Sequence, residues 1–317
     1  MIAGFDIGGT KCAVVLAQND IELLREGKAI ISKASFSTSE YPSPESAMNK
    51  LGELLNGMLT EHKSHGVLEG IGISCGGPLD SKKGIILSPP NLPGWDEVHI
   101  TEYFNDLYGV PVVLNNDANA CAVAEWRFGA ATDTDNAVFL TFGTGMGAGL
   151  ILDGRLYCGA SDMAGEVGHV RLADSGPFGY GKHGSFEGFC SGGGIARMAE
   201  DMLTHFDGET NLRGVKLTAK AVCEQMYRGD KFAESVMLRC GEYLGRALAM
   251  LADILNPEVI VIGSIYERNT EFFLPVITEV IRREALPETA RILKIRPSRL
   301  GNSIGDYAAL GLIVKQG

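Results

Sequence analysis

The alternation of apolar and polar positions predicts several strands, and two of the strand pairs look alike. The segments MIAGFDIGGTKCAVVLA (1–17) and NAVFLTFGTGMGAGLILDGRLY (136–157) each place a glycine-rich turn between apolar strands, which is the pattern of a β-hairpin. Apolar runs at 66–77, 109–117 and 258–264 predict further buried strands. The likeness of the two hairpins predicts two lobes that are built on a common plan.

Helical periodicity accounts for much of the remaining chain. Ser43 is the predicted N-cap of an amphipathic helix, and a second helical pattern follows Asp117 directly. The longest pattern, over 230–257, stops at Pro257 because proline cannot continue a helix. The last segment predicts a helix that is opened by Asp306.

Composition narrows the class of protein. The chain has 317 residues, 45% of them hydrophobic, which favours a two-lobed α/β protein. Its net charge of -11 makes nucleic acid an unsuitable partner, because binding phosphates needs a basic surface. No apolar run approaches the roughly 20 residues that cross a bilayer, and the N-terminus lacks the pattern of a signal peptide. Seven cysteines, none in a CxxC pair, predict buried reduced thiols, so we expect a cytoplasmic protein without a membrane partner.

The glycine-rich turns of both hairpins are candidate phosphate-binding sites. Without side chains in the way, a phosphate can approach backbone N–H groups closely. The first turn adds Asp6 as a candidate cation ligand, a hydroxyl from Thr10 and a charge from Lys11, and the second adds Thr144. Two plain hairpins are the alternative interpretation. Neither turn matches the P-loop or the dinucleotide-binding pattern.

Seven motifs in order resemble a known family over nearly the whole chain. They are GFDIGGTK, GIGISCGGPLD, NLPGW, NNDANACAVAEW, FGTGMGAGLI, GEVGH and NPEVIVIG. In combination they resemble the sugar kinases of the ROK family, within the actin-like ATPase superfamily. The resemblance implies a two-lobed actin-like (ribonuclease H-like) α/β fold with a nucleotide and sugar cleft between the lobes. We expect an N-terminal lobe over 1–116, on which the helix 304–317 packs back, and a C-terminal lobe over 117–303.

The resemblance also implies which residues bind the nucleotide. The family's phosphate and adenosine segments match Asp6, Gly8, Gly9, Thr10, Lys11, Gly143, Thr144, Gly145 and Gly263. ATP and Mg are therefore the expected cosubstrate and cofactor, with Asp6 as a candidate Mg contact. After Gly263 the family usually has a second glycine, whereas this chain has Ser264.

A second set of matches concerns the sugar. The family's sugar-binding positions match Asn91, Asn116, Asp117, Glu166, His169 and Glu187. The resemblance makes Asp117 the catalytic base, and the chemistry agrees, because a sugar hydroxyl must lose its proton as the phosphoryl group arrives. The structural alternatives are a helix N-cap for Asp117, a turn residue for Asn91 and a hydrogen-bonded buried imidazole for His169.

The loop from Gly165 to Cys190 departs from the family. Many relatives carry a Cys-x-Cys-Gly-x-x-Gly-Cys run there, which binds structural zinc together with the histidine. In this chain Phe178, Tyr180 and Ser185 replace the three cysteines, so a Cys₃His site cannot form and we expect no zinc. We expect the two aromatic side chains to secure the loop by burial and Ser185 to satisfy a backbone group. Upstream, Gly76 replaces the usual proline of a loop beside the sugar.

These observations predict an ATP-dependent hexose kinase, with glucose as the first choice of acceptor and a homodimer as the expected assembly. N-acetylmannosamine, N-acetylglucosamine, fructose, allose and β-glucosides stay open as acceptors. A sugar-sensing repressor of the same family is a second hypothesis, but the phosphate segment of the first motif begins at Asp6, and we expect no room for a DNA-binding domain before it. An actin-like ATPase that acts on a protein partner is a third.

Overall fold

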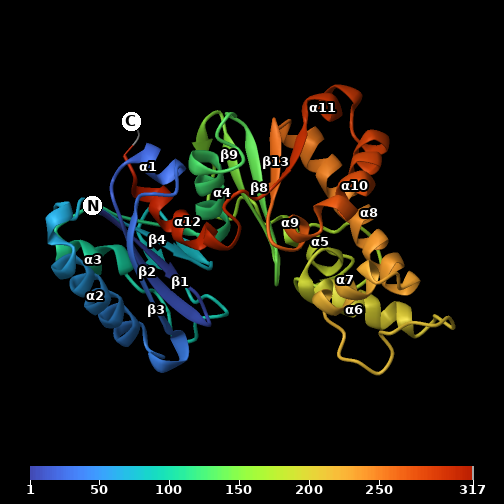
Figure 1. Cartoon of the computed structure of the whole chain (residues 1–317), viewed down its shortest axis with the longest axis horizontal. Coiled ribbons are helices and arrows are strands. Elements are labelled where there is room, and N and C mark those ends of the chain that lie inside the picture. Colours follow the sequence, from blue (N-terminus) through green and yellow to red (C-terminus); the bar gives the residue numbers. More distant parts are fainter. Residues whose placement is uncertain (316–317) are drawn as a thin grey trace.

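Each predicted hairpin lies at the centre of its own five-stranded sheet in the computed structural model, which describes residues 1–315 (Figure 1). The first sheet has the order β3-β2-β1-β4-β7, with bounds Ile30–Ser37, Lys11–Ala17, Ile2–Ile7, Gly70–Cys75 and Val112–Asn116. The second has the order β10-β9-β8-β13-β14, with bounds Arg155–Leu156, Met146–Leu152, Ala137–Phe142, Val259–Ile262 and Lys294–Pro297. In both, the hairpin is antiparallel and its first strand pairs in parallel with a later strand. The common plan predicted from the two hairpins is confirmed.

Helices cover both faces of the first sheet. Helices α2 (Pro44–Glu61) and α3 (Ile100–Tyr108) pack on one face and share a hydrophobic core with its strands. Helix α12 (Ile304–Ile313) packs on the other face, against β1 and β4. The short elements of this lobe are α1 (Ile21–Arg25), η1 (Thr38–Glu40), η2 (Lys63–His65), β5 (Leu79–Asp80) and β6 (Ile85–Ile86).

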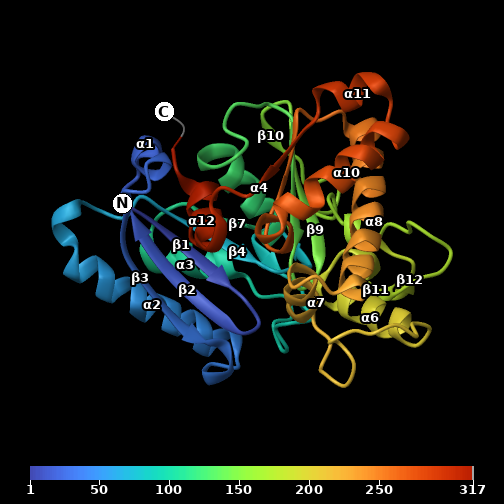
Figure 2. The ribbon, with the colours of Figure 1, turned by 45° about the vertical axis from the view of Figure 1, so that its right-hand side comes forward.

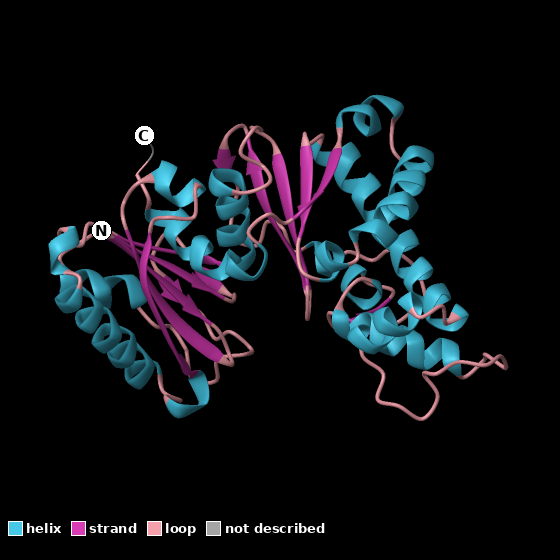
Figure 3. Ribbon diagram, in the orientation of Figure 1, coloured by secondary structure: helices cyan, strands magenta, loops and turns pink. Residues whose placement is uncertain are grey.

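Helix α4 (Asp117–Phe128) lies between the two sheets, where it contacts α12 on one side and β8 and β9 on the other (Figure 3). The helices beyond the second sheet are α5 (Phe186–Phe189), α6 (Gly192–Leu203), α7 (Ala219–Tyr227), α8 (Lys231–Leu255), α9 (Ile265–Arg268), α10 (Thr270–Glu284) and α11 (Pro287–Ile292). Between β10 and α5 run η3 (Val167–His169) and a small hairpin of β11 (Phe178–Gly179) and β12 (Lys182–His183), and η4 (Gly301–Ser303) precedes α12. Figure 2 shows the small hairpin near α6 and α8.

Local sequence explains where the main helices begin and end. Ser43 caps α2 as predicted, because its hydroxyl accepts a hydrogen bond from the N–H of Ser46. Helix α8 ends at Leu255, and Asn256 takes a left-handed conformation (φ 46°) before Pro257. The prediction that Asp306 opens the last helix is wrong by two residues. Helix α12 begins at Ile304 because the η4 turn leads directly into it, and Asp306 instead pairs with Lys33 at 2.7 Å.

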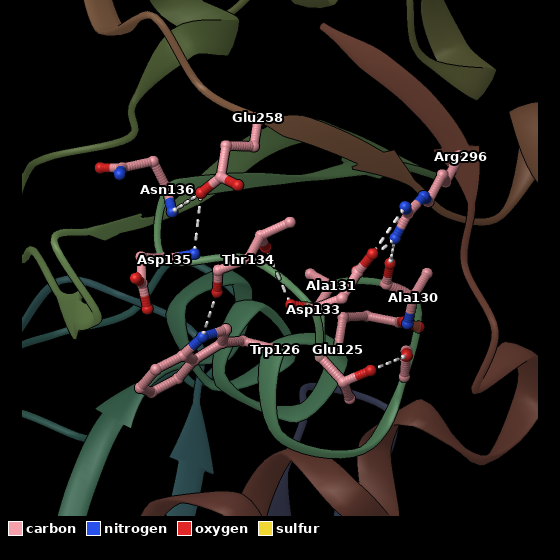
Figure 4. A network of polar contacts seen from close by, with 12 residues as sticks. Glu125, Trp126, Ala130, Ala131, Asp133, Thr134, Asp135, Asn136, Glu258 and Arg296 are labelled. Atoms are coloured by element: carbon pink, nitrogen blue, oxygen red, sulfur yellow. Dashed lines mark hydrogen bonds and ion pairs between the residues drawn. The ribbon is translucent and has the colours of Figure 1, made fainter. Parts of the chain in front are cut away.

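Two segments connect the lobes: the step from β7 into α4, and the step from β14 into α12. A buried carboxylate, Glu125 of α4, holds the second step (Figure 4). It accepts hydrogen bonds from the Ser298 hydroxyl (2.6 Å) and from the N–H groups of Ala130 (2.7 Å), Arg299 (3.3 Å) and Leu300 (3.1 Å). Helix α4 is therefore tied to both connections, because β7 runs directly into its first residue.

Among residues 1–315, no helix combines the length and the apolar character needed to cross a membrane.

Candidate functional site

A cavity of about 720 Å³ opens between the lobes at the N-terminal end of α4. Its walls come from the loops after β4, β7, β8 and β10, so both sheets contribute. Of the residues matched to the family's sites, it is lined by Asn91, Asn116, Asp117, Gly143, Thr144, Gly145, Glu166 and Glu187. The strand-end position of these groups is where open α/β sheets bind ligands.

Asn116 and Asp117 lie where β7 passes into α4. The helix is capped by Asn116, whose side chain accepts from the N–H of Ala118 at 2.9 Å, while Asp117 is the first helical residue. The N-cap alternative considered for Asp117 therefore applies to its neighbour. The Asp117 carboxylate also accepts from the N–H of Ala118 (2.8 Å) and is exposed to the cavity.

Other negatively charged side chains lie near the carboxylates of Asp117 and Asp6. Enclosure by the cavity walls raises the pKa of Asp117, and the charge of Glu166 raises it further. Burial and the charge of Asp117 raise the pKa of Asp6 to about 6, although Lys11 opposes the shift. Asp6 lies at the end of β1, outside the residues that line the cavity. A carboxylate in such surroundings favours a proton or a cation as its partner.

The turn of the second hairpin forms the floor of the cavity. A Cβ atom on Gly145 would lie 2.9 Å from Oε2 of Glu187, so a side chain there would displace this carboxylate from its present position. The same oxygen of Glu187 accepts from the N–H of Met146 at 3.1 Å. Glycine at this position thus keeps the backbone of the turn open while Glu187 stays beside it.

The first hairpin approaches the cavity from the other lobe. A Cβ on Gly9 would lie 2.5 Å from the carbonyl oxygen of Asn91, so the turn packs directly on this cavity residue. The hydroxyl of Thr38 donates to the carbonyl of Gly8 at 2.6 Å and holds the turn in place. Gly9, Thr10 and Lys11 are exposed. The turn therefore leaves its backbone and the Lys11 ammonium accessible.

Gly263 directly follows β13, beside the second hairpin. The next residue, Ser264, has φ 57° and ψ -106°, a conformation that favours glycine, which explains why a glycine is usual at this position in the family. The Ser264 hydroxyl lies 3.5 Å from where a Cβ on Gly143 would be. Beyond it, a second cavity of about 460 Å³ is lined by Ala219, Lys220, Cys223, Glu224, Tyr227, Ile265, Arg268 and Asn269.

The loop from Gly165 to Cys190 closes one side of the first cavity. Ser185 is fully buried; its hydroxyl donates to the carbonyl of Gly179 (2.7 Å) and accepts from the N–H of Gly188 (3.0 Å), so the expected backbone contact is confirmed. The expected burial of the aromatic side chains is wrong, since Phe178 is 49% and Tyr180 39% exposed. The small hairpin that carries them is too short to fold over them, and the loop is secured beneath by buried Phe186.

Polar contacts from Tyr180 and Lys182 reach the two predicted residues near η3. The Tyr180 hydroxyl donates to Oε2 of Glu166, and the Lys182 ammonium lies 3.2 Å from Nδ1 of His169. His169 is exposed and does not line the cavity, but its ring lies 5.2 Å from that of Tyr180, which does. The alternative of a buried imidazole at His169 is therefore wrong.

Several cavity residues were missed by sequence reasoning. Tyr180, Met163 and Asp162 line the wall formed by the C-terminal lobe, and Asp162 accepts from the N–H (2.8 Å) and the hydroxyl (2.7 Å) of Ser81 in the other lobe. Asp162 and Met163 lie three and two residues before the GEVGH motif, so their place in the sequence was the available sign. No feature of the local sequence indicates the contact of Ser81 with Asp162, because the two residues are 81 positions apart.

The arrangement suits transfer of a charged group to a polar acceptor. The glycine turn Gly143–Gly145 lines the same cavity as the Asp117 carboxylate, and the remaining cavity walls carry amide and carboxylate groups that bind hydroxyls. The turn of the first hairpin packs on one of these wall residues, Asn91. Within the described residues, no three or more histidine, cysteine, aspartate or glutamate side chains are grouped so as to hold a metal ion.

Comparisons with known proteins agree with this geometry. A family model described as ROK family matches residues 2–315. A glucokinase from Halalkalibacterium halodurans is 33% identical over 321 aligned positions, which cover 99% of this chain and 94% of that protein. The transcriptional repressor Mlc of Escherichia coli is 30% identical and is matched by 78% of this chain over 60% of its own length. A crystal structure of a ROK family glucokinase from Streptomyces griseus, in complex with glucose and AMPPNP, superposes with a TM-score of 0.70 at 28% identity and 97% coverage of both chains.

Proposed function

We infer that this chain, which belongs to the ROK family, is an ATP-dependent sugar kinase, and we propose glucose as its acceptor and Asp117 as its general base. The observation that carries the proposal is the position of Asp117. Its carboxylate opens into the cavity between the Gly143–Gly145 turn and the polar wall that contains Glu166. An acceptor hydroxyl placed there lies between a base and a phosphate-binding turn.

The base acts on the attacking hydroxyl. Phosphoryl transfer depends mainly on positioning and on charge stabilisation, and a carboxylate within hydrogen-bond reach adds to these by accepting the hydroxyl proton. The raised pKa of Asp117 makes it a better proton acceptor than an ordinary aspartate. Its place in the first turn of α4 keeps the side chain in one orientation.

The sugar ring lies, in this proposal, against the cavity wall. Asn91, Asn116, Glu166 and Glu187 bind hydroxyls, because amide and carboxylate oxygens accept from them and amide N–H groups donate to them. Four carboxylates line the cavity, those of Asp117, Asp162, Glu166 and Glu187, and they favour a neutral polyol over an anionic substrate. His169 joins these residues from the edge of the site.

The nucleotide occupies the region between the two hairpins. We propose that the backbone of the turns at Gly8–Gly9 and Gly143–Gly145 binds the phosphates and that Thr10, Lys11 and Thr144 add polar and charged contacts. The adenosine then follows Gly263 toward the cavity of about 460 Å³ beside Ile265, which offers an apolar surface for a base.

Mg fits this site as an ion shared with the phosphates. Magnesium prefers oxygen ligands and is usually bound through one or two carboxylates plus substrate phosphates, so the absence of a larger acidic cluster among residues 1–315 is compatible with it. Asp6 is the carboxylate we propose for it, and its raised pKa fits a group that gains from a nearby cation. When bound, the ion neutralises charge on the transferred phosphoryl group. Zinc has no part in this proposal.

Two features support the proposed homodimer and the proposed cytoplasmic location. Three exposed apolar side chains lie together, Val170 (41%) directly after η3 and Met250 (43%) and Ile254 (72%) on α8. A second copy would cover this surface. All seven cysteines, which lie within the described residues, are unpaired. Light scattering coupled to gel filtration tests the dimer.

A kinase assay coupled to ADP release tests the activity. Glucose should give the highest kcat/KM, with N-acetylmannosamine, N-acetylglucosamine, fructose, allose and a β-glucoside as competitors. Sugar-independent ATP hydrolysis would favour an ATPase that acts on a protein, and sugar binding without ADP release would favour a sensor. Either result would overturn the kinase proposal.

A further inference from the structure

The small hairpin β11–β12 has an unusual tip. Its two turn residues, Tyr180 and Gly181, both have positive φ (51° and 74°), as in a type I′ turn. Asparagine, aspartate or glycine is usual at the first of these positions, and a tyrosine there is strained. Strain of this kind persists where a side chain has a task that requires it. The side chain of Tyr180 lines the cavity.

The hydroxyl of Tyr180 occupies one oxygen of a candidate sugar ligand. It donates to Oε2 of Glu166. Burial, together with this hydrogen bond, raises the pKa of Tyr180, so the phenol keeps its proton and remains a donor at neutral pH. Oε2 of Glu166 is thereby fixed on the phenol, whereas Oε1 is left free for a donor from another molecule. The carboxylate cannot rotate freely, because rotation would break the bond to Tyr180.

Lys182, two residues further on, occupies one ring nitrogen of the other candidate sugar ligand, His169. Its ammonium lies 3.2 Å from Nδ1 of His169. An ammonium has only protons to donate, so Nδ1 of His169 must accept and therefore carries no hydrogen. The ring proton of the neutral imidazole is consequently on Nε2. The ring of Tyr180 packs edge-on against His169 at 5.2 Å and restricts its rotation.

We propose that the β11–β12 hairpin is the positioning element of the sugar site, in which Tyr180 and Lys182 leave Glu166 with one free acceptor oxygen and His169 with one donor nitrogen, Nε2. Acceptor and donor then meet the sugar with defined hydrogen-bonding character. The inference rests on the proposed sugar kinase function, but the state of His169 can be measured without substrate. Tyr180 and Lys182 are positioning residues and not catalytic ones.

His183, on the same hairpin, supplies an internal reference. Its Nδ1 lies 2.9 Å from the carbonyl oxygen of Gly176, which can only accept. Nδ1 of His183 therefore carries the proton, so the two histidines are expected to be opposite tautomers. Long-range ¹H–¹⁵N spectra of the free protein distinguish the two forms. We expect the Nε2–H form for His169 and the Nδ1–H form for His183.

The first experiment follows the tautomers in variants. Lys182→Met should return His169 to a mixture of the two tautomers, with His183 unchanged, whereas Lys182→Arg, which still donates, should keep the Nε2–H form. Lys216→Met, at an exposed lysine of the same lobe, is the matched control and should change neither histidine. An Nδ1–H form of His169 in the wild type, or no change in Lys182→Met, would overturn the proposal whatever the kinase activity.

The second experiment uses glucose kinetics. Tyr180→Phe removes one oxygen atom, and we expect it to raise the KM for glucose about threefold to tenfold, the usual effect of one hydrogen bond, with the KM for ATP and kcat little changed. Lys182→Met should have a similar effect. Tyr157→Phe, at an exposed tyrosine of the same lobe, should leave the KM for glucose unchanged. Unaltered glucose KM values in both hairpin variants, in a protein that phosphorylates glucose, would refute the positioning role. A wild type that phosphorylates no sugar, but shows the expected tautomers, would refute the proposed function and not the hydrogen-bond assignment.

Discussion

Two carboxylates on the same helix, eight residues apart, have opposite surroundings. Glu125, near the C-terminal end of α4, is 1% exposed and accepts four hydrogen bonds. Asp117, at the N-terminal end, is exposed to the cavity and accepts one such bond, from the N–H of Ala118. The first carboxylate has its acceptor capacity filled by protein donors, whereas the second has most of it free.

The difference separates a structural carboxylate from a reactive one. A buried charge is tolerated when hydrogen bonds replace the water it has lost, and such a group then holds the chain together. Enclosure by the protein and, after it, the nearby charge of Glu166 raise the pKa of Asp117, and with unfilled acceptor capacity this carboxylate is ready to take a proton or a substrate hydroxyl. The same side-chain chemistry therefore has two roles, and its partners decide which.

The largest expected effect is on activity. Asp117→Asn keeps the shape of the side chain but removes the proton acceptor, so kcat should fall by about 10²–10⁴, the usual contribution of general-base catalysis. Glucose affinity by calorimetry should change far less, and the free energy of unfolding should stay the same or rise, because an unfavourable charge is removed. Steady-state kinetics and urea unfolding measure both quantities. Near-normal turnover in this variant would mean that the two carboxylates do not differ as described.

The second prediction concerns the other carboxylate, Glu125, and its effect on stability. Glu125→Ala leaves a small cavity and four unpaired donors, so it should lower the free energy of unfolding by about 3–4 kcal/mol. These donors are on Ala130, Ser298, Arg299 and Leu300. Because the chemistry takes place at the other end of α4, the folded variant should keep kcat within about tenfold. Urea unfolding monitored by circular dichroism gives the stability. If Glu125→Ala lost activity as Asp117→Asn does while remaining stable, Glu125 would belong to the reactive class.

Asp6 extends the comparison to pH. The pKa of Asp6 is raised to about 6, whereas the ordinary value of 3.8 applies to the unfolded chain. Between these values the native state holds a proton that the unfolded state has released, so stability falls as pH rises through this window. Asp6→Asn should therefore gain stability relative to wild type at pH 8, on the order of 2–3 kcal/mol, and the gain should vanish near pH 4.

The activity of the wild type should change with pH in the opposite direction to its stability. Below about pH 6 the proton on Asp6 competes with the proposed Mg contact, so wild-type kcat/KM for ATP should fall as the solution becomes more acidic. Urea unfolding of both variants across pH, paired with pH–rate profiles of the wild type, tests the two signs together. A stability difference between wild type and Asp6→Asn that does not depend on pH would show that Asp6 is unperturbed.

The sequence was enough to predict the role of Asp117 but not that of Glu125. The glycine turns, the paired hairpins and the Asn116–Asp117 step lie within short motifs, so local pattern was enough to find them. Three of the four partners of Glu125 lie 173 to 175 residues further along the chain, and no local pattern connects them. The tip of the small hairpin was misjudged for a related reason. Tyr180 reads as an aromatic side chain to be buried, and only the fold places its hydroxyl on Glu166.

The smallest expected effect comes from removing one of the four donors to Glu125. Ser298 is 8% exposed; its hydroxyl donates to Glu125 at 2.6 Å and accepts from the N–H of Gly301 at 3.2 Å. Ser298→Ala should therefore lower the free energy of unfolding by about 1–2 kcal/mol, the usual range for one or two buried hydrogen bonds, with kinetic constants unchanged. A double-mutant cycle with Glu125→Ala separates the two bonds, because Glu125→Ala removes the acceptor of the Ser298 hydroxyl and leaves the bond to Gly301 in place. We expect a coupling energy of about 0.5–1.5 kcal/mol. A coupling energy near zero would mean that Ser298 stabilises the protein through its bond to Gly301 alone. The stability gained from hydrogen bonds to Glu125 would then come from its three backbone N–H donors.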